Sequence, residues 1–145
     1  MSPKLEAIGW AIAEGHTGDY PFQLRFRQFE SDFPYSNFSQ RLNIFWSMQN
    51  PDKRGYASES ELEHLHSFED RLVAAVETDH FSVLAMTVTG SNEREFVFYT
   101  SDPTEFIKRL SLMPQEEVRY PIEIHRSDDD KWEYYNNEIR NVRPT

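Results

Sequence analysis

Residues 81–101 read FSVLAMTVTGSNEREFVFYTS and contain the pattern that decides the fold. Two runs rich in β-branched and aromatic residues are joined at Gly90, Ser91 and Asn92, which is the pattern of a β-hairpin. Residues 84–88 carry apolar side chains on both faces, so a covering layer is predicted on each side of the sheet. On the second side, that layer is either an aromatic loop or another subunit. We therefore expect this hairpin at the centre of an antiparallel sheet.

Alternating apolar and polar residues predict three further strands, and a short apolar run at residues 7–13 predicts a fourth. They lie within residues 5–14, 21–29, 41–49 and 119–126, and the alternation is strictest in 41–49. The first two strands form an N-terminal hairpin, because Gly and Asp residues typical of a turn lie between them. Pro121 has no amide hydrogen, so the last strand is predicted to begin near it or to lie at a sheet edge.

Two helices are marked by their capping residues. Ser58 and Glu61 form a capping box at the start of a helix that runs to about Thr78. Asp102 followed by Pro103 marks the start of a second, shorter helix. After the N-terminal hairpin, the order is strand, helix, strand, strand, helix, strand. This order predicts an α+β fold with a ferredoxin-like βαββαβ core, in which two helices cover one face of an antiparallel sheet.

The length of 145 residues suits one domain with a substantial core and is short for two. We therefore predict a single domain over residues 1–145. Its parts are an N-terminal hairpin at 5–29, a ferredoxin-like core at 41–126, and a C-terminal aromatic segment and tail at 127–145. The tail is polar from Asn136 onward and is expected to fray.

The composition excludes several kinds of site and location. The chain has no cysteine, which removes disulfides, cysteine-based zinc sites and thiol nucleophiles, and which fits a reducing compartment. No apolar run approaches the roughly 20 residues that span a bilayer, and the N-terminus lacks the pattern of a signal peptide. We therefore expect a cytoplasmic protein with no membrane partner. The five glycines do not cluster as a phosphate-binding loop requires, so no cofactor is predicted.

The net charge of −10 is concentrated in residues 59–79, which carry seven acidic side chains and the single base Arg71. Such a surface repels a phosphate backbone, so direct binding of nucleic acid is disfavoured. It attracts a basic protein instead. The predicted partner-binding residues are Glu59, Glu61, Glu63, Glu69 and Asp70. The alternative interpretation is that these charges form only the solvated face of a helix and keep the protein soluble.

Patterns for catalysis or metal binding are weak. Glu61 and His64 have the i, i+3 spacing of a metal-binding pair, but no second segment supplies further ligands in a recognisable pattern. His66 points about 200° away from His64 around the helix axis, so both histidines are interpreted as surface residues. The acidic triplet 128–130 lacks the glycine and glutamate of an EF-hand, and nothing marks the acid pair 116–117 as catalytic. No catalytic residue and no metal site is predicted.

A second hypothesis is a small-ligand-binding protein or an enzyme. The aromatic loop, which contains Phe33, Tyr35 and Phe38, is predicted to pack over the sheet, and a pocket between loop and sheet would be lined by large rings. The candidate pocket residues are Arg25, Arg27, Trp46, Tyr99, Trp132 and Tyr134. Core packing is the alternative explanation for these rings. A third hypothesis is a homodimer that joins exposed sheet edges.

Six features stand out in order along the chain: IGWAIAEG, FQLRFRQF, ESELEHLHSFEDRLVAAVE, TVTG, REFVFYTSD and the closing pair Trp132 and Tyr134. This set resembles the domain of unknown function 695 family over nearly the whole chain. That family is similar in pattern to the type B inhibitor of ribonuclease E activity, which is acidic and has a ferredoxin-like fold. The resemblance implies the same fold and a role in protein-binding regulation, and it supplies no catalytic residues. We therefore expect an acidic protein-binding or regulatory module without catalytic activity.

Overall fold

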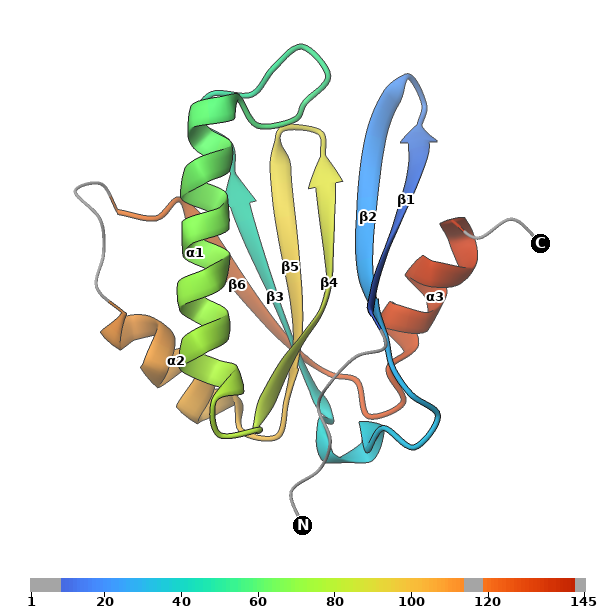
Figure 1. Cartoon of the computed structure of the whole chain (residues 1–145), viewed down its shortest axis with the longest axis vertical. Helices are drawn as coiled ribbons and strands as arrows, with labels where there is room; N and C mark the ends of the chain where they lie inside the picture. Colours follow the sequence, from blue (N-terminus) through green and yellow to red (C-terminus); the bar gives the residue numbers. More distant parts are fainter. Residues whose placement is uncertain (1–8, 114–118, 143–145) are drawn as a thin grey trace.

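The computed structural model describes residues 9–113 and 119–142 and shows an antiparallel sheet with helices on both faces (Figure 1). The strands are β1 (Gly9–Thr17), β2 (Tyr20–Gln28), β3 (Gln40–Ser47), β4 (Ser82–Gly90), β5 (Glu93–Thr100) and β6 (Ile122–Asp128). The helices are α1 (Glu59–Glu77), α2 (Pro103–Leu112) and α3 (Glu133–Val142), and a short 3-10 turn, η1 (Tyr35–Asn37), precedes β3. The sheet has six strands in the order β1-β2-β4-β5-β3-β6. The predicted α+β class is therefore confirmed.

The β4–β5 hairpin lies at the centre of the sheet, as its sequence predicts. Its two turn residues, Ser91 and Asn92, have positive φ angles of 52° and 68°. Two consecutive positive φ angles are typical of the type I′ turn, whose twist matches that of the strands. The pairing reaches the turn with Gly90 opposite Glu93. The edges of the sheet are β1 and β6, so the homodimer through sheet edges stays a prediction about these two strands.

Helices α1 and α2 cover one face of the sheet. Helix α1 begins at its predicted cap, where the Glu61 amide donates to the Ser58 hydroxyl, and α2 begins after Asp102, which accepts from a first-turn amide. Their apolar sides join the inward residues of β3, β4 and β5 in one hydrophobic cluster. Fully buried members are Leu42, Ile44, Leu65, Phe68, Leu72, Val76, Phe96, Phe98 and Phe106. The amphipathic pattern of both helices therefore serves the core on this face.

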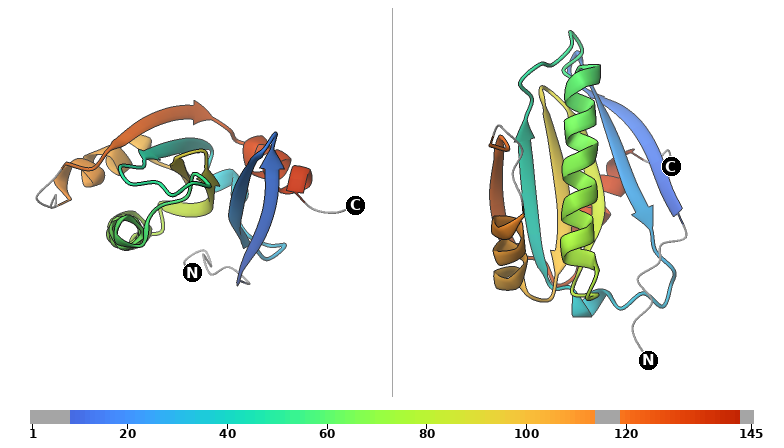
Figure 2. Two further views of the ribbon diagram at one scale, coloured as in Figure 1. Left: turned by 90° about the horizontal axis from the view of Figure 1, so that it is seen from above. Right: turned by 60° about the vertical axis from the view of Figure 1, so that its left-hand side comes forward.

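The aromatic loop and α3 cover the other face. Trp132, which precedes α3, stacks on Tyr99 of β5 with ring centroids 3.9 Å apart and planes 9° apart. Its indole nitrogen donates to the Phe38 carbonyl at 2.9 Å, and Phe33 packs in the same hydrophobic cluster. The second layer that the apolar β4 requires thus comes from this same chain. Figure 2 shows α1 on one side of the sheet and α3 on the other.

The C-terminal segment differs from the prediction. Helix α3 spans Glu133–Val142 and so includes residues 136–142 of the polar tail that was expected to fray. It forms because Asp129 accepts hydrogen bonds from the Glu133 and Tyr134 amides at 2.8 and 3.2 Å and so satisfies the helix start. The last strand begins at Ile122, somewhat later than predicted. The acid pair 116–117 and residues 5–8 of the first predicted strand lie outside the described residues. No helix in the described ranges is long and apolar enough to cross a membrane.

Candidate functional site

The acidic residues of α1 do not share one surface. Glu61 is only 4% exposed, and its carboxylate accepts hydrogen bonds from the Trp46 indole at 3.0 Å and from the amides of Gln49 and Asn50 at 2.7 Å. Burial alone would raise the pKa of Glu61, but these hydrogen bonds outweigh burial and lower it. Glu61 therefore fastens the loop after β3 to the start of α1.

Of the other four predicted partner residues, Glu69 forms a part-buried ion pair and the remaining three are exposed. Glu69 faces the sheet and pairs with the Arg25 guanidinium of β2 at 2.5 Å. Glu59, Glu63 and Asp70 are exposed on the outer side of α1. Only these three of the five predicted residues are thus available to a partner on that helix.

The predicted pocket residues lie on opposite faces of the sheet. Arg25 and Arg27 are on the α1 side, and Trp46 is buried in the core beneath that helix. Tyr99 and Trp132 are buried in the core on the α3 side, and Tyr134 packs against that core. The six predicted pocket residues are therefore divided between the two faces of the sheet and do not line one common pocket.

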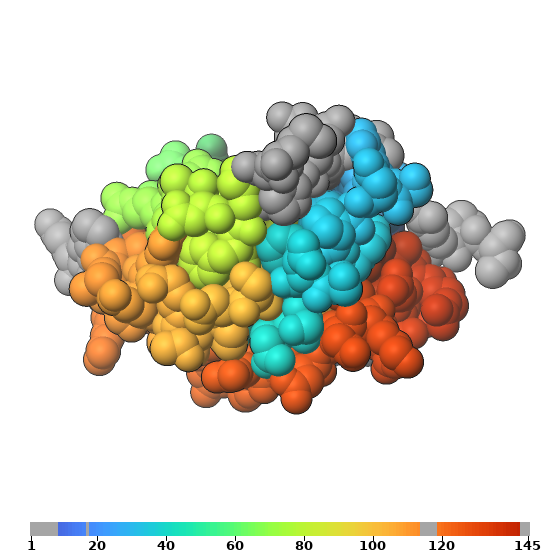
Figure 3. Space-filling model, turned by 90° about the horizontal axis from the view of Figure 1, so that it is seen from below, coloured from blue at the N-terminus to red at the C-terminus, as the bar shows by residue number. Residues whose placement is uncertain are grey.

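The space between the aromatic loop and the sheet is filled by rings. Phe33 lies 5.6 Å from Phe38 and 5.8 Å from Trp132, measured between ring centroids. Tyr35 closes the group at 4.8 Å from Trp132. In the space-filling view from below, this loop, in cyan, lies directly against the orange-red C-terminal part (Figure 3). The rings that were candidates for a ligand pocket thus form core at this end of the molecule.

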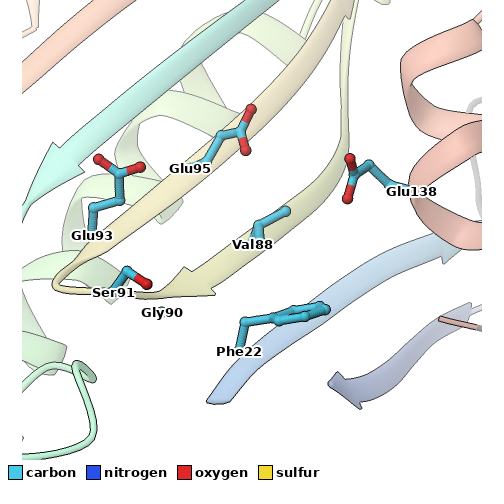
Figure 4. Close-up of a pocket in the computed structure, with 7 residues that line it drawn as sticks. All are labelled: Phe22, Val88, Gly90, Ser91, Glu93, Glu95 and Glu138. Carbon is cyan, nitrogen blue, oxygen red and sulfur yellow. The ribbon is translucent and has the colours of Figure 1, made fainter. Parts of the chain in front are cut away.

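A pocket of about 230 Å³ lies at the other end of the sheet, beside the β4–β5 turn (Figure 4). Its walls come from β2, β4, β5 and α3, and the lining residues are Phe22, Val88, Gly90, Ser91, Glu93, Glu95 and Glu138. In Figure 4 the carboxylate of Glu138 points from α3 toward Val88 and β5. Phe22 and Val88 supply an apolar floor, and three carboxylates stand around it. We call this site the acidic pocket.

Glu95 is the innermost carboxylate of the acidic pocket and is 7% exposed. Its oxygens accept hydrogen bonds from the Asn43 side-chain amide at 2.6 Å and from the Tyr134 hydroxyl at 2.7 and 3.0 Å. Both donors are neutral, so they position the carboxylate and leave its charge uncompensated. A buried carboxylate of this kind favours a cation that can approach its open side.

The pKa values of the other two carboxylates are raised by burial and by the charge of Glu95. Burial, then the charges of Glu95 and Glu123, raise the pKa of Glu93. Burial, then the charge of Glu95, raises the pKa of Glu138. No ion pair within the described ranges includes Glu93, Glu95 or Glu138. Raised carboxyl pKa values next to like charges indicate a site that lacks its counter-ion.

A polar network around Asp129, next to the acidic pocket, positions Tyr134. Asp129 is 7% exposed and accepts from the Tyr99 hydroxyl at 2.6 Å and from the Arg41 guanidinium at 2.9 Å. Burial alone would raise the pKa of Asp129, but these hydrogen bonds and those from the α3 amides lower it. Arg41 also lies over the Tyr134 ring at 4.5 Å. The network therefore holds Tyr134 where its hydroxyl reaches Glu95.

Sequence reasoning missed the acidic pocket, although part of its signal was present. Glu93 and Glu95 are two residues apart on β5, so strand geometry places both side chains on one face. Glu138 reaches them only because α3 docks on that face. None of the described histidines and acids form a group of three or more that could hold a metal ion.

The family model for the family of unknown function DUF695 matches residues 9–138. The chain belongs to this DUF695 family. The resemblance seen in the sequence is therefore confirmed over all six strands, and the match ends within α3 at Glu138 of the acidic pocket. No curated protein and no solved structure matches the chain significantly.

Proposed function

We propose that this DUF695 protein is a binding module for a basic protein, and that the acidic pocket receives a lysine or arginine side chain of the partner. The observation that carries the proposal is the set of three carboxylates, Glu93, Glu95 and Glu138, around one pocket without a basic partner among the described residues. A bound ammonium or guanidinium group supplies the missing charge.

The size of the pocket favours a side chain over a whole small molecule. Pockets for drug-sized ligands are typically about 300–1,000 Å³, whereas this one is about 230 Å³. The apolar floor of Phe22 and Val88 suits the methylene stem of a lysine or arginine, while the carboxylates meet its charged end. A small organic cation that fits the same volume is the competing ligand and forms one arm of the experiment below.

Long-range electrostatics supports the same kind of partner. The net charge of −10 raises the association rate of a cationic protein and lowers that of an anionic one. On this view, exposed Glu59, Glu63 and Asp70 on α1 steer the partner and make no close contact with it. The absence of cysteine supports a reducing compartment such as the cytoplasm.

We also infer a ferredoxin-like core within the sheet. The order β4-β5-β3-β6 with α1 and α2 on one face supports this arrangement, and β1 and β2 extend it beyond β4. A regulatory role through protein binding, as the resemblance implies, is consistent with a pocket on the face of the sheet opposite α1 and α2.

The experiment measures binding of a fluorescent lysine- and arginine-rich peptide by anisotropy at low and high salt. The pocket variant Glu93→Gln/Glu138→Gln is compared with Glu63→Gln/Asp70→Asn, which changes the net charge equally on α1. We expect the pocket variant to bind at least about tenfold more weakly and the α1 variant to bind nearly as wild type.

Two results would contradict the proposal. Equal weakening in both variants would mean that the net charge attracts the peptide without a defined site. Tight, pocket-dependent binding of a small diamine, with no binding of the peptide, would assign the acidic pocket to a small ligand instead.

A further inference from the structure

A second polar group lies on the opposite face of the sheet, beside α1. Arg25 and Arg27 extend from β2, and Trp10 lies opposite Arg27 on β1. Arg94 of β5 lies opposite Thr89, two strands away from β2. Thr89 in turn pairs with Gln23 of β2, and alternate residues of a strand and paired residues of neighbouring strands share a face, so Trp10, Arg25, Arg27 and Arg94 lie on the same face of the sheet. Figure 2 shows that β1 and β2 curve toward the side on which α1 lies.

Buried donors without acceptors are concentrated at this place. Arg25 Nε, Arg27 Nε and Arg27 Nη1 are buried and have no hydrogen-bond partner, and the only other such side-chain atom in the described residues is Gln40 Oε1. Buried polar groups in native proteins nearly always have a partner, and an orphaned charged donor is costly. Three orphaned nitrogens on these two arginines of β2 therefore indicate that their acceptor is missing from the described part of the chain.

Arg94 adds a third guanidinium to the group. It is only 8% exposed, and within the described residues its one hydrogen bond runs from Nε to the Thr89 hydroxyl at 2.9 Å. Its two terminal nitrogens therefore have no acceptor among the described residues and can donate to a ligand. Burial, and secondarily the charge of Arg25, lower the pKa of Arg94 against the opposing effect of Glu69. The guanidinium consequently lacks a full counter-charge.

The charges of the group do not cancel. Glu69 pairs with Arg25 at 2.5 Å, and Glu77 pairs with Arg27 at 3.2 Å, which leaves the charge of Arg94 in excess. Trp10 holds the first two guanidinium groups against its ring, at 4.6 and 5.2 Å from the ring centroid. These cation–π contacts help to hold both guanidinium groups in place, as a preorganised site requires.

We propose that Arg25, Arg27 and Arg94 form an oxyanion site that binds a phosphate or carboxylate group. Guanidinium groups recognise both anions through paired N–H donors, and the orphaned nitrogens of Arg25 and Arg27 with the terminal nitrogens of Arg94 supply them. This site is separate from the acidic pocket, which lies on the other face of the sheet, and it does not depend on the proposed function. The two sites together give the protein one cation-binding and one anion-binding face.

The experiment follows the arginine Nε–H signals by NMR while inorganic phosphate or acetate is added at constant ionic strength. We expect saturable shifts of Arg25 and Arg27 and none of Arg54, whose side chain is 66% exposed and already paired with Asp52. The variant Arg27→Lys keeps the charge and removes the paired donors, and Arg94→Gln removes the excess charge. Both should weaken binding at least about tenfold, while Arg54→Lys should bind as wild type does.

Every outcome of this titration either supports or overturns the proposed oxyanion site. Tighter binding of phosphate identifies a phosphate site, and tighter binding of acetate identifies a carboxylate site. Shifts no larger than those in chloride, or unchanged affinity in Arg27→Lys, would show that water satisfies these nitrogens and would overturn the proposal. Arg94 is buried, so Arg94→Gln can fail to fold. In that case Arg27→Lys, which changes a partly exposed side chain and keeps its charge, tests the proposal by itself.

Discussion

Replacing Glu61 by alanine should destabilise the protein far more than its place on an acidic helix suggests. The change removes the acceptor of three donors: the Trp46 indole and the amides of Gln49 and Asn50. Trp46 is 3% exposed, so its orphaned N–H costs about 1–3 kcal/mol. The two amides lie in an exposed loop that water reaches, and each adds about 0.5–1 kcal/mol. The expected loss is about 2–5 kcal/mol of the free energy of unfolding.

Urea unfolding followed by tryptophan fluorescence measures this loss. The control is Glu63→Ala, which lies two residues after Glu61 on the same helix but is exposed, and which should change stability by less than about 0.5 kcal/mol. A Glu61→Ala variant within 0.5 kcal/mol of the control would refute the inference that Glu61 holds the loop to α1.

The effect of Glu61 should also depend on pH. Because the folded-state pKa of Glu61 is lowered, its stabilisation is present above the unfolded-state pKa and is lost as the pH falls through the folded-state pKa. The stability difference between wild type and Glu61→Ala should therefore shrink in acid. A difference that stays constant from neutral pH down to strongly acidic pH would mean that the carboxylate charge plays no part.

Three further outcomes are expected. Glu138→Gln should raise the melting temperature at neutral pH, because a raised carboxyl pKa destabilises the fold as the pH rises through it, and this gain should vanish below the unfolded-state pKa. Trp132→Ala should cost about 3–5 kcal/mol in urea unfolding, because it removes the stack on Tyr99 and the hydrogen bond to Phe38; a loss below 1 kcal/mol would contradict a structural role. Asp129→Ala should lower thermal stability and reduce the helical circular dichroism signal, because Arg41 loses its ion pair and the Glu133 and Tyr134 amides lose their acceptor; an unchanged spectrum would argue against this capping role.

The sheet and two of its helices could be predicted because their signals are local. Alternation within 41–49 and the caps at Ser58 and Asp102 depend only on neighbours in the chain, and the structure places β3, α1 and α2 accordingly. Helix α3 was missed because its sequence is polar and its cap, Asp129, is itself held by Arg41 and Tyr99 from other strands. Its formation therefore depends on contacts distant in sequence.

The acidic pocket depends on the same distant contacts. The alternation on β5 places Glu93 and Glu95 on one face, but the approach of Glu138 requires the docked α3. Likewise, the acids of α1 looked equivalent in sequence, whereas the folded chain buries Glu61, pairs Glu69 and exposes Glu63. Charge patterns in the sequence thus indicated the class of partner without locating the contact surface.

The most direct test of cation binding is a carbon-13 NMR titration of the Glu93 and Glu138 carboxyl groups, with and without a saturating lysine- and arginine-rich peptide. In the free protein, both pKa values should lie above the ordinary glutamate value, since burial and neighbouring carboxylates raise them. A guanidinium or ammonium group in the acidic pocket should lower both pKa values. Pocket pKa values that do not move when the peptide binds would show that the cation is held elsewhere.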